Sequence, residues 1–200
     1  CAGLSIAATP WQCVVLRLRA DKPGAGELYW TGAEEGPYKG FHWEKLAPFS
    51  VKGTGQWETI AVFPFWQSEK IIHKLRLDLY NNAHFAIESI RIVSWADDAK
   101  AASANSEWVF DSATAWRPVP ESATYMIPVN MPTSGKNWAV LRIKSTRDEM
   151  ASLLWGTRDA RGCMSEDIAL RGDGQSHYYN VELRGNPAWK GTLAAVGVRL

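Results

Sequence analysis

The sequence predicts an all-β protein built from two tandem antiparallel β-sandwich domains. Short segments with apolar residues at every second position recur between turns that contain Gly or Pro. No segment of useful length has the 3.6-residue periodicity of an amphipathic helix. A third observation is an internal repeat, in which one order of strands and turns occurs twice. Many short strands separated by such turns are typical of an antiparallel sandwich.

The repeat is clearest in the second part of each copy. Residues 172–175 (Gly-Asp-Gly-Gln) correspond to residues 53–56 (Gly-Thr-Gly-Gln), and an aromatic strand and a Pro-x-Trp loop follow in both. Eleven positions separate the Trp of that loop from a Leu in each copy, so we expect this part to align without gaps, with Trp66 at Trp189 and Leu77 at Leu200.

The first part of each copy aligns separately. Residues 16–18 (Leu-Arg-Leu) correspond to residues 141–143 (Leu-Arg-Ile), and Trp30 corresponds to Trp155, both 125 positions apart. The repeat therefore divides the 200 residues into two modest domains, each of a size that is normal for a sandwich.

The domain boundaries follow from composition. Residues 96–107 are small and polar and contain no aromatic residue, which is typical of a linker. We therefore expect the first β-sandwich repeat over residues 1–95 and the second over residues 108–200.

Alternation and turn residues place the individual strands. In the first copy the expected strands are 4–8, 14–19, 27–31, 57–63, 71–79 and 85–93, with a long loop over 32–50. In the second copy they are 108–110, 123–129, 139–144, 151–156, 166–170, 177–183 and 192–199.

Each copy lacks one terminal strand of the other. The first has no counterpart of 108–110, and the second has no counterpart of 85–93. A missing strand exposes unpaired backbone groups on its neighbour, so we expect at least one of these edges to be covered by the other domain, the linker or a partner strand.

This order of strands and turns resembles the galactose-binding-like, jelly-roll β-sandwich repeats of secreted proteins from planctomycete-type bacteria, which are often described as carbohydrate-binding-like. The resemblance covers most of both copies. It implies a fold and, as one possible function, carbohydrate binding at the cell envelope. Its motifs are strand and turn signatures, which specify a fold better than a ligand.

Charge and hydropathy exclude some classes of partner. The net charge is +1 and the isoelectric point is about 7.9, without a basic face or a block of like charge, so we expect no nucleic-acid partner. No run of eighteen or more apolar residues is present, so no segment is expected to span a membrane as a helix.

The cysteines provide information on the cellular location of the protein and on its thiols. A chain that begins with Cys1 resembles a mature bacterial lipoprotein, so we expect lipid attachment at Cys1 and an extracytoplasmic, membrane-anchored location on the periplasmic side. The alternative is that Cys stands first by accident. Cys13 and Cys163 occupy non-equivalent places in the two copies and are expected to be buried thiols.

Few residues suggest catalysis. The four His have no metal-site spacing, and the Gly-x-Gly segments lack the strand-to-helix context of a phosphate loop. We therefore expect no enzyme activity, no catalytic residue, no bound metal and no cofactor.

The eleven Trp carry more information. Four of them recur in both copies and are expected in the cores: Trp30, Trp66, Trp155 and Trp189. Five further Trp do not recur in both copies, so the fold alone does not require them: Trp43, Trp57, Trp95, Trp116 and Trp138. The candidate binding residues are three of these and two aromatic neighbours of Trp43 on its Gly- and Pro-rich loop: Tyr38, Phe41, Trp43, Trp57 and Trp116.

Two functions are consistent with these features. The first is a non-catalytic, lipid-anchored accessory subunit that docks on a membrane protein complex, for example an electron-transfer or photosynthetic complex. The second is a carbohydrate-binding module at the cell envelope, as the family resemblance implies. A short tether at Cys1 favours protein partners at the membrane, whereas the Trp content favours polysaccharide.

Overall fold

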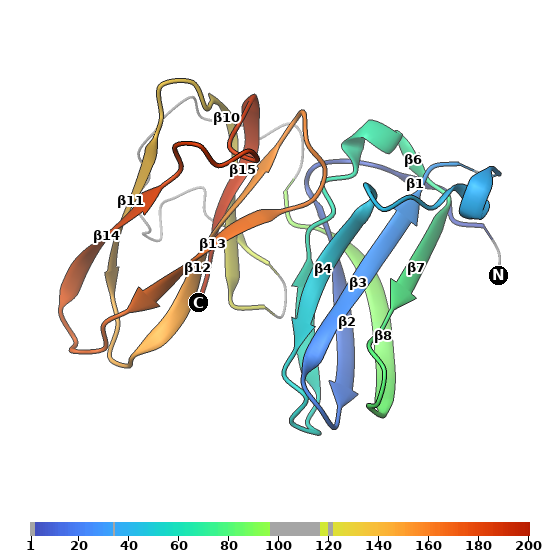
Figure 1. The fold of residues 1–200 in the computed structure, drawn as a ribbon, viewed down its shortest axis with the longest axis horizontal. Coiled ribbons are helices and arrows are strands. Elements are labelled where there is room, and N and C mark those ends of the chain that lie inside the picture. The colour runs from blue at the N-terminus through green and yellow to red at the C-terminus, as the bar shows by residue number, and fades with distance from the viewer. Residues whose placement is uncertain (1–2, 34, 97–116, 120–121) are drawn as a thin grey trace. The chain divides into compact units, whose positions relative to one another are not determined.

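The computed structural model describes residues 3–33, 35–96, 117–119 and 122–200 (Figure 1). In these residues every strand pair is antiparallel, and the only helical elements are two short 3-10 turns. The prediction of an all-β, sandwich-like architecture is confirmed. No helix in this part of the chain has the length and apolar character needed to cross a bilayer.

Contacts divide the chain into two compact units. The first contains residues 1–97, 120–122 and 161–163, and the second contains the remaining residues. Each unit has its own hydrophobic core.

Among its described residues, the first unit contains eight strands in two three-stranded sheets and one two-stranded sheet. The sheet orders are β5-β2-β8, β4-β3-β7 and β1-β6. The strands are β1 (Ile6–Ala7), β2 (Gln12–Ala20), β3 (Gly24–Thr31), β4 (Leu46–Val51), β5 (Glu58–Val62), β6 (Ile71–Ile72), β7 (Lys74–Asp78) and β8 (Phe85–Ser94), and the 3-10 turns are η1 (Pro37–Gly40) and η2 (Gln67–Glu69).

The core of the first unit follows from the alternation of β2. Val14, Leu16 and Leu18 point to one face of the strand and are fully buried. Trp30 and Trp66 pack edge to face beneath them, with ring centroids 6.2 Å apart and planes at 78°. Edge-to-face contact is a favoured geometry for large aromatic rings.

The second unit contains a five-stranded sheet of order β13-β12-β15-β10-β9 and a two-stranded sheet, β11-β14. Trp155 and Trp189 pack edge to face in its core, 5.6 Å apart at 82°. The strands are β9 (Arg117–Pro118), β10 (Thr124–Pro132), β11 (Trp138–Lys144), β12 (Glu149–Thr157), β13 (Met164–Leu170), β14 (Ser176–Glu182) and β15 (Thr192–Arg199). The core placement expected for the four recurring Trp is confirmed, with Trp189 half-buried.

Strand pairing follows the repeat. On β2, Leu16 lies opposite Ile60, and the corresponding Leu141 on β11 lies opposite Tyr179. Ile60 and Tyr179 occupy matching positions after the Gly-x-Gly-Gln turns. The pairs β2·β5 and β11·β14 therefore have the same register.

The central strands β3 and β12 also correspond. Leu28 lies between Ala47 and Leu77, and Leu153 lies between Glu166 and Val198. The residue equivalent to Leu77 is thus Val198, two positions before Leu200. The gap-free alignment of this part is wrong, because the chain between the Pro-x-Trp loop and the last strand is two residues shorter in the second copy.

A larger difference in length lies between β3 and β4. Leu28 and Leu153 are 125 positions apart, whereas Ala47 and Glu166 are 119 apart. The connection from β12 to β13 is therefore six residues shorter than the connection from β3 to β4. The longer connection carries η1 and three of the candidate aromatic residues.

Two strand predictions need correction. The expected loop over 32–50 contains most of β4, where Ala47, Phe49 and Val51 face the core. Pro48 conceals this alternation, and it is tolerated because β4 forms the edge of its sheet. The expected strand at 71–79 is divided at His73 into β6 and β7. Strand 108–110 and all but the first residue of the 96–107 linker lie outside the described residues.

The sheets differ at one edge. β2 lies between β5 and β8, whereas β11, its counterpart, pairs with β14 alone among the described strands. No strand that the structure describes is a counterpart of β8 in the second copy. The expected cover over this edge is not provided by any strand that the structure describes.

Candidate functional site

The predicted loop aromatics lie on the connection between β3 and β4. Tyr38 is 85% exposed and Trp43 is 71% exposed, and the Trp43 ring lies 5.4 Å from the ring of His42. Tyr38 and Lys39 have φ values of 54° and 60°, a left-handed conformation that is costly for residues other than Gly. The loop therefore accepts backbone strain while it presents Tyr38 to solvent.

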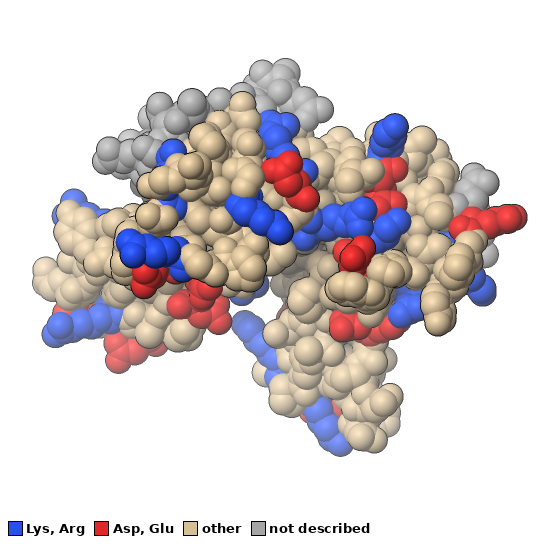
Figure 2. Space-filling view, turned by 45° about the horizontal axis from the view of Figure 1, so that its top comes forward, with Lys and Arg blue, Asp and Glu red and all other residues tan. Residues whose placement is uncertain are grey.

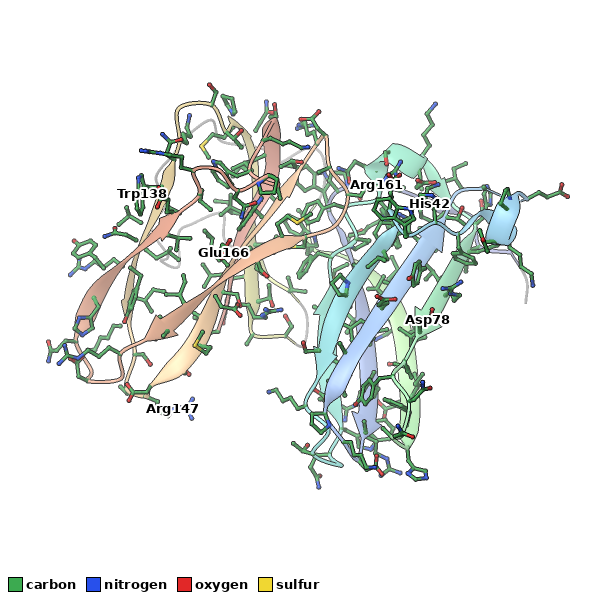
Figure 3. All side chains as sticks on the ribbon, viewed as in Figure 1. His42, Asp78, Trp138, Arg147, Arg161 and Glu166 are labelled. Carbon is green, nitrogen blue, oxygen red and sulfur yellow. The ribbon has the colours of Figure 1, made fainter. Side chains whose placement is uncertain are left out.

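A buried carboxylate anchors this loop. Glu69 accepts hydrogen bonds from the Gly32 backbone N–H (3.0 Å) and the Lys45 ammonium (2.9 Å). Arg161, which groups with the first unit and is labelled in Figure 3, lies 3.7 Å from Glu69 and 3.9 Å from Glu44. The Glu69 side chain is nearly inaccessible, so its charge is balanced by these cations.

Phe41 has a different environment from its neighbours. The Arg76 guanidinium lies between Phe41 and Tyr29, 5.4 Å and 4.3 Å from the ring centroids. Asp78 accepts two hydrogen bonds from Arg76, which raise the pKa of that guanidinium. The Tyr29 hydroxyl donates to Glu27, and this bond raises the pKa of Tyr29. Phe41 is thus one face of a filled aromatic–arginine stack.

Trp57 lies apart from the loop aromatics. It precedes β5, where the guanidinium groups of Arg17 and Arg19 lie 5.8 Å and 5.1 Å from its ring centroid. Those arginines belong to the end of β2 that leads into β3, whereas the loop with Tyr38 begins after the far end of β3. Eight residues of strand span about 26 Å, so the structure does not bring Trp57 to the loop. Cys1 and Trp116 lie outside the described residues.

The sequence-based candidates omit an exposed patch on the outer face of β11 and β14. Trp138, Val140 and Tyr178 are 50%, 61% and 68% exposed. Arg142, in phase with Trp138 and Val140 on β11, lies opposite Tyr178, with its guanidinium 5.8 Å from that ring. Figure 3 shows Trp138 at the outer side of the strand. We call Trp138, Val140, Arg142 and Tyr178 the outer patch.

The signal for the outer patch is in the sequence. Ala139, Leu141 and Ile143 pack against the core, so Trp138 and Val140 must point the other way. Trp138 also has no counterpart in the first copy, where Cys13 stands at the corresponding position, but only the alternation along β11 and β14 places it beside Val140 and Tyr178.

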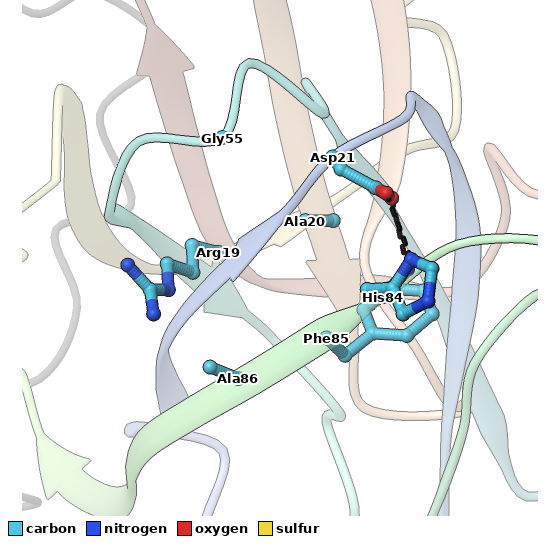
Figure 4. Close-up of a pocket in the computed structure, with 7 residues that line it drawn as sticks. All are labelled: Arg19, Ala20, Asp21, Gly55, His84, Phe85 and Ala86. Atoms are coloured by element: carbon cyan, nitrogen blue, oxygen red, sulfur yellow. Dashed lines mark hydrogen bonds and ion pairs between the residues drawn. The ribbon is translucent and has the colours of Figure 1, made fainter.

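Two His–Asp pairs are the remaining polar features of note. Asp21 Oδ1 accepts the His84 backbone N–H (2.8 Å), and the His84 ring lies 2.9 Å from Oδ2, beside a shallow 290 Å³ depression (Figure 4). These bonds, the backbone bond foremost, lower the pKa of Asp21. The His177 ring lies 2.8 Å from Asp173, and this side-chain bond, followed by the bond from the Gln175 backbone N–H, lowers the pKa of Asp173.

The chemistry available at these pairs is limited. Both aspartates lie in exposed turn regions, where solvent screens their charges. Within the part of the chain that the structure describes, no three His, Cys, Asp or Glu residues come together as a metal site. Acidic and basic side chains are interspersed over the face shown in Figure 2. The arrangement supports binding through exposed aromatic side chains better than it supports a reaction.

Comparisons with known proteins return no assignment: no family model matches the chain, and no curated protein matches it.

Proposed function

We propose that the protein is a non-catalytic accessory subunit that docks on a larger protein complex. The observation that supports this proposal is the outer patch, where Trp138, Val140 and Tyr178 present apolar surface beside one arginine. Aromatic residues and Arg are enriched at protein interfaces, and a cluster of exposed apolar side chains is typical of a contact surface. The sequence-based expectation of a lipid on Cys1 extends the proposal to a membrane complex on the periplasmic side.

The proposal also concerns the type of β-sandwich. We infer two tandem jelly-roll sandwiches of the galactose-binding-like type. Matching registers of β2·β5 with β11·β14, and the two edge-to-face Trp pairs, support it. Many functions occur on such a scaffold, so the function must be argued from the exposed residues.

Carbohydrate binding is the second candidate. It is favoured by Tyr38 and Trp43, which are exposed on a loop with a strained backbone. Flat aromatic rings in such positions suit stacking on sugar rings. This loop and the outer patch are separate sets of residues, so substitutions can distinguish the two functions.

Attachment at Cys1 has its own test. If Cys1 carries acyl chains, intact-mass analysis of protein from its native membrane will show a mass above that of the 22.3 kDa polypeptide. A mass equal to that of the bare polypeptide would contradict lipid attachment and leave docking through the outer patch to be tested separately.

Two matched double variants test the function itself. We expect Trp138→Ala with Tyr178→Ala to abolish copurification with the complex, because the variant removes both rings of the outer patch. We expect Tyr38→Ala with Trp43→Ala to leave copurification intact and to abolish any retention on a polysaccharide affinity gel. All four side chains are exposed, so each variant should change the free energy of unfolding by about 0.5 kcal/mol or less per substitution.

The readouts are stoichiometry in native pull-downs and retardation on the gel, with circular dichroism as the control for folding. Retention of the parent by polysaccharide, lost only in the loop variant, would replace the subunit proposal with the carbohydrate-binding one. A parent that neither copurifies at fixed stoichiometry nor binds polysaccharide would contradict both.

A further inference from the structure

The internal repeat contains a template for the edge of β11 that does not face β14. In the first unit, β8 pairs with β2 over nine residue pairs, from Gln12 opposite Ser94 to Ala20 opposite Phe85. The opposite edge of β2 pairs with β5 in the same register in which β11 pairs with β14. The edge of β11 that corresponds to the β8 side has no partner among the described strands.

We propose that this edge of β11 binds an extended segment of a partner protein, which adds to the sheet as an antiparallel strand in the place that β8 occupies on β2. The proposal rests on the docking function, and it specifies which side chains the partner segment must have. Unpaired backbone N–H and C=O groups provide the affinity of such strand addition, and alternate side chains provide its specificity.

The template defines which partner residues face the core. On β2, Leu16 lies opposite Ile90, which is 46% exposed, and Val14 lies opposite Ile92, which packs against the core of the first unit. The corresponding residues of β11 are Leu141 and Ala139, which pack against the core of the second unit. The partner segment therefore needs an apolar side chain opposite Ala139, with a second and more exposed apolar side chain two residues earlier, opposite Leu141.

Charge defines one further position. Arg17 on β2 forms an ion pair with Glu88, which lies at the irregularity in the β2·β8 pairing. Its counterpart Arg142 is exposed, contacts the Tyr178 ring and has no carboxylate partner among the described residues. An acidic residue two positions before the apolar residue opposite Leu141 would reproduce the Arg17–Glu88 pair.

The charges of β11 favour a different protein, and not a second copy of this chain, as the source of the added strand. β11 consists of Trp-Ala-Val-Leu-Arg-Ile-Lys and contains no acidic residue, so two β11 edges would bring together four cations without a carboxylate. The β8 strand of another copy is already paired with its own β2. An acidic and apolar segment of a partner protein satisfies both Arg142 and the core-facing positions.

A peptide test uses the template itself. The probe is a synthetic peptide with the sequence of Phe85–Ser94 (FAIESIRIVS), labelled with a fluorophore, and the protein is the full chain. We expect saturable binding by fluorescence anisotropy, together with slower amide exchange across β11 and unchanged exchange across β2. No saturable binding, or slowed exchange confined to other strands, would overturn the proposal. Protein that is dimeric by light scattering, with β11 amides protected in the dimer, would overturn it in favour of a second copy.

A charge swap provides the matched control. Arg142→Glu should weaken binding of the peptide about fivefold, the upper range for an exposed ion pair. A peptide with Arg in place of Glu88 should recover the affinity for that variant. Lys52→Glu, an exposed substitution in the first unit with the same change of charge, should leave binding unchanged. Equal affinity of both peptides for both proteins would place the peptide elsewhere and refute the register.

The experiments distinguish a failure of the docking function from a failure of strand addition at β11. If the protein copurifies with a complex but the peptide does not bind, docking uses another surface and only strand addition is refuted. If the peptide protects β11 but no complex copurifies, the edge accepts a strand and the subunit function is refuted.

Discussion

Trp155→Ala is expected to destabilise the second unit by about 3–5 kcal/mol, the usual cost when a buried Trp is truncated. Trp155 is 1% exposed and forms the edge-to-face pair with Trp189, so no rearrangement of the surface can fill its volume. The indole also donates a hydrogen bond to the Ala188 carbonyl, which the substitution leaves without its donor.

Native-state amide exchange measures this effect for each unit. Amides of β12 should exchange faster in Trp155→Ala. The matched variant Trp30→Ala truncates the equivalent residue of the first unit, and in it the amides of β2 should exchange faster. Trp138→Ala serves as the exposed control and should lie within about 0.5 kcal/mol of the parent. A loss below about 1 kcal/mol in Trp155→Ala would show that the Trp pair does not support its core.

Alkaline pH is expected to destabilise the first unit through Cys13. Burial raises the pKa of this thiol to about 12, compared with an ordinary value of 9.0. The folded state thus holds a proton that the unfolded state releases, and stability must fall as pH rises from about 9 towards 12. Three pKa units correspond to about 4 kcal/mol over the whole range, of which about 1 kcal/mol is lost between pH 9 and 10.

A comparison with Cys13→Ala isolates this contribution. The variant loses some packing at every pH, but the difference between parent and variant should shrink as the pH rises above 9. Urea titrations at pH 8, 9 and 10 measure it. A parent and variant whose stabilities fall in parallel would show that Cys13 does not control the alkaline response.

The sequence predicts best what depends on local alternation. Val14, Leu16 and Leu18 identify β2 as a half-buried strand, and the repeat of Trp30 at Trp155 identifies both cores. The same rule fails at β4, where Pro48 interrupts an otherwise regular alternation. The repeat itself could have corrected this error, since β13 pairs with β12 as β4 pairs with β3.

Contacts between distant residues are less predictable. Glu69 resembles an ordinary surface acid in the sequence, and its burial depends on Gly32, Lys45 and Arg161 meeting it from three other segments. Phe41 resembles its loop neighbours Tyr38 and Trp43, yet only the folded chain brings Arg76 over its ring. Of the candidate site, the sequence therefore identifies exposed loop residues but not their separate environments.

The unequal connections between β3 and β4 and between β12 and β13 show which part of the chain can differ in length while the scaffold stays the same. Both copies close their cores with the same aromatic pairs and registers although one connection is six residues longer. A segment that one copy lacks is not needed for the core and the register that the copies share, so the length of this connection can change without changing them. The first copy presents Tyr38 and Trp43 on its longer connection, whereas residues 158–163, which join β12 to β13, contain no aromatic residue, so this surface differs between two copies with the same scaffold.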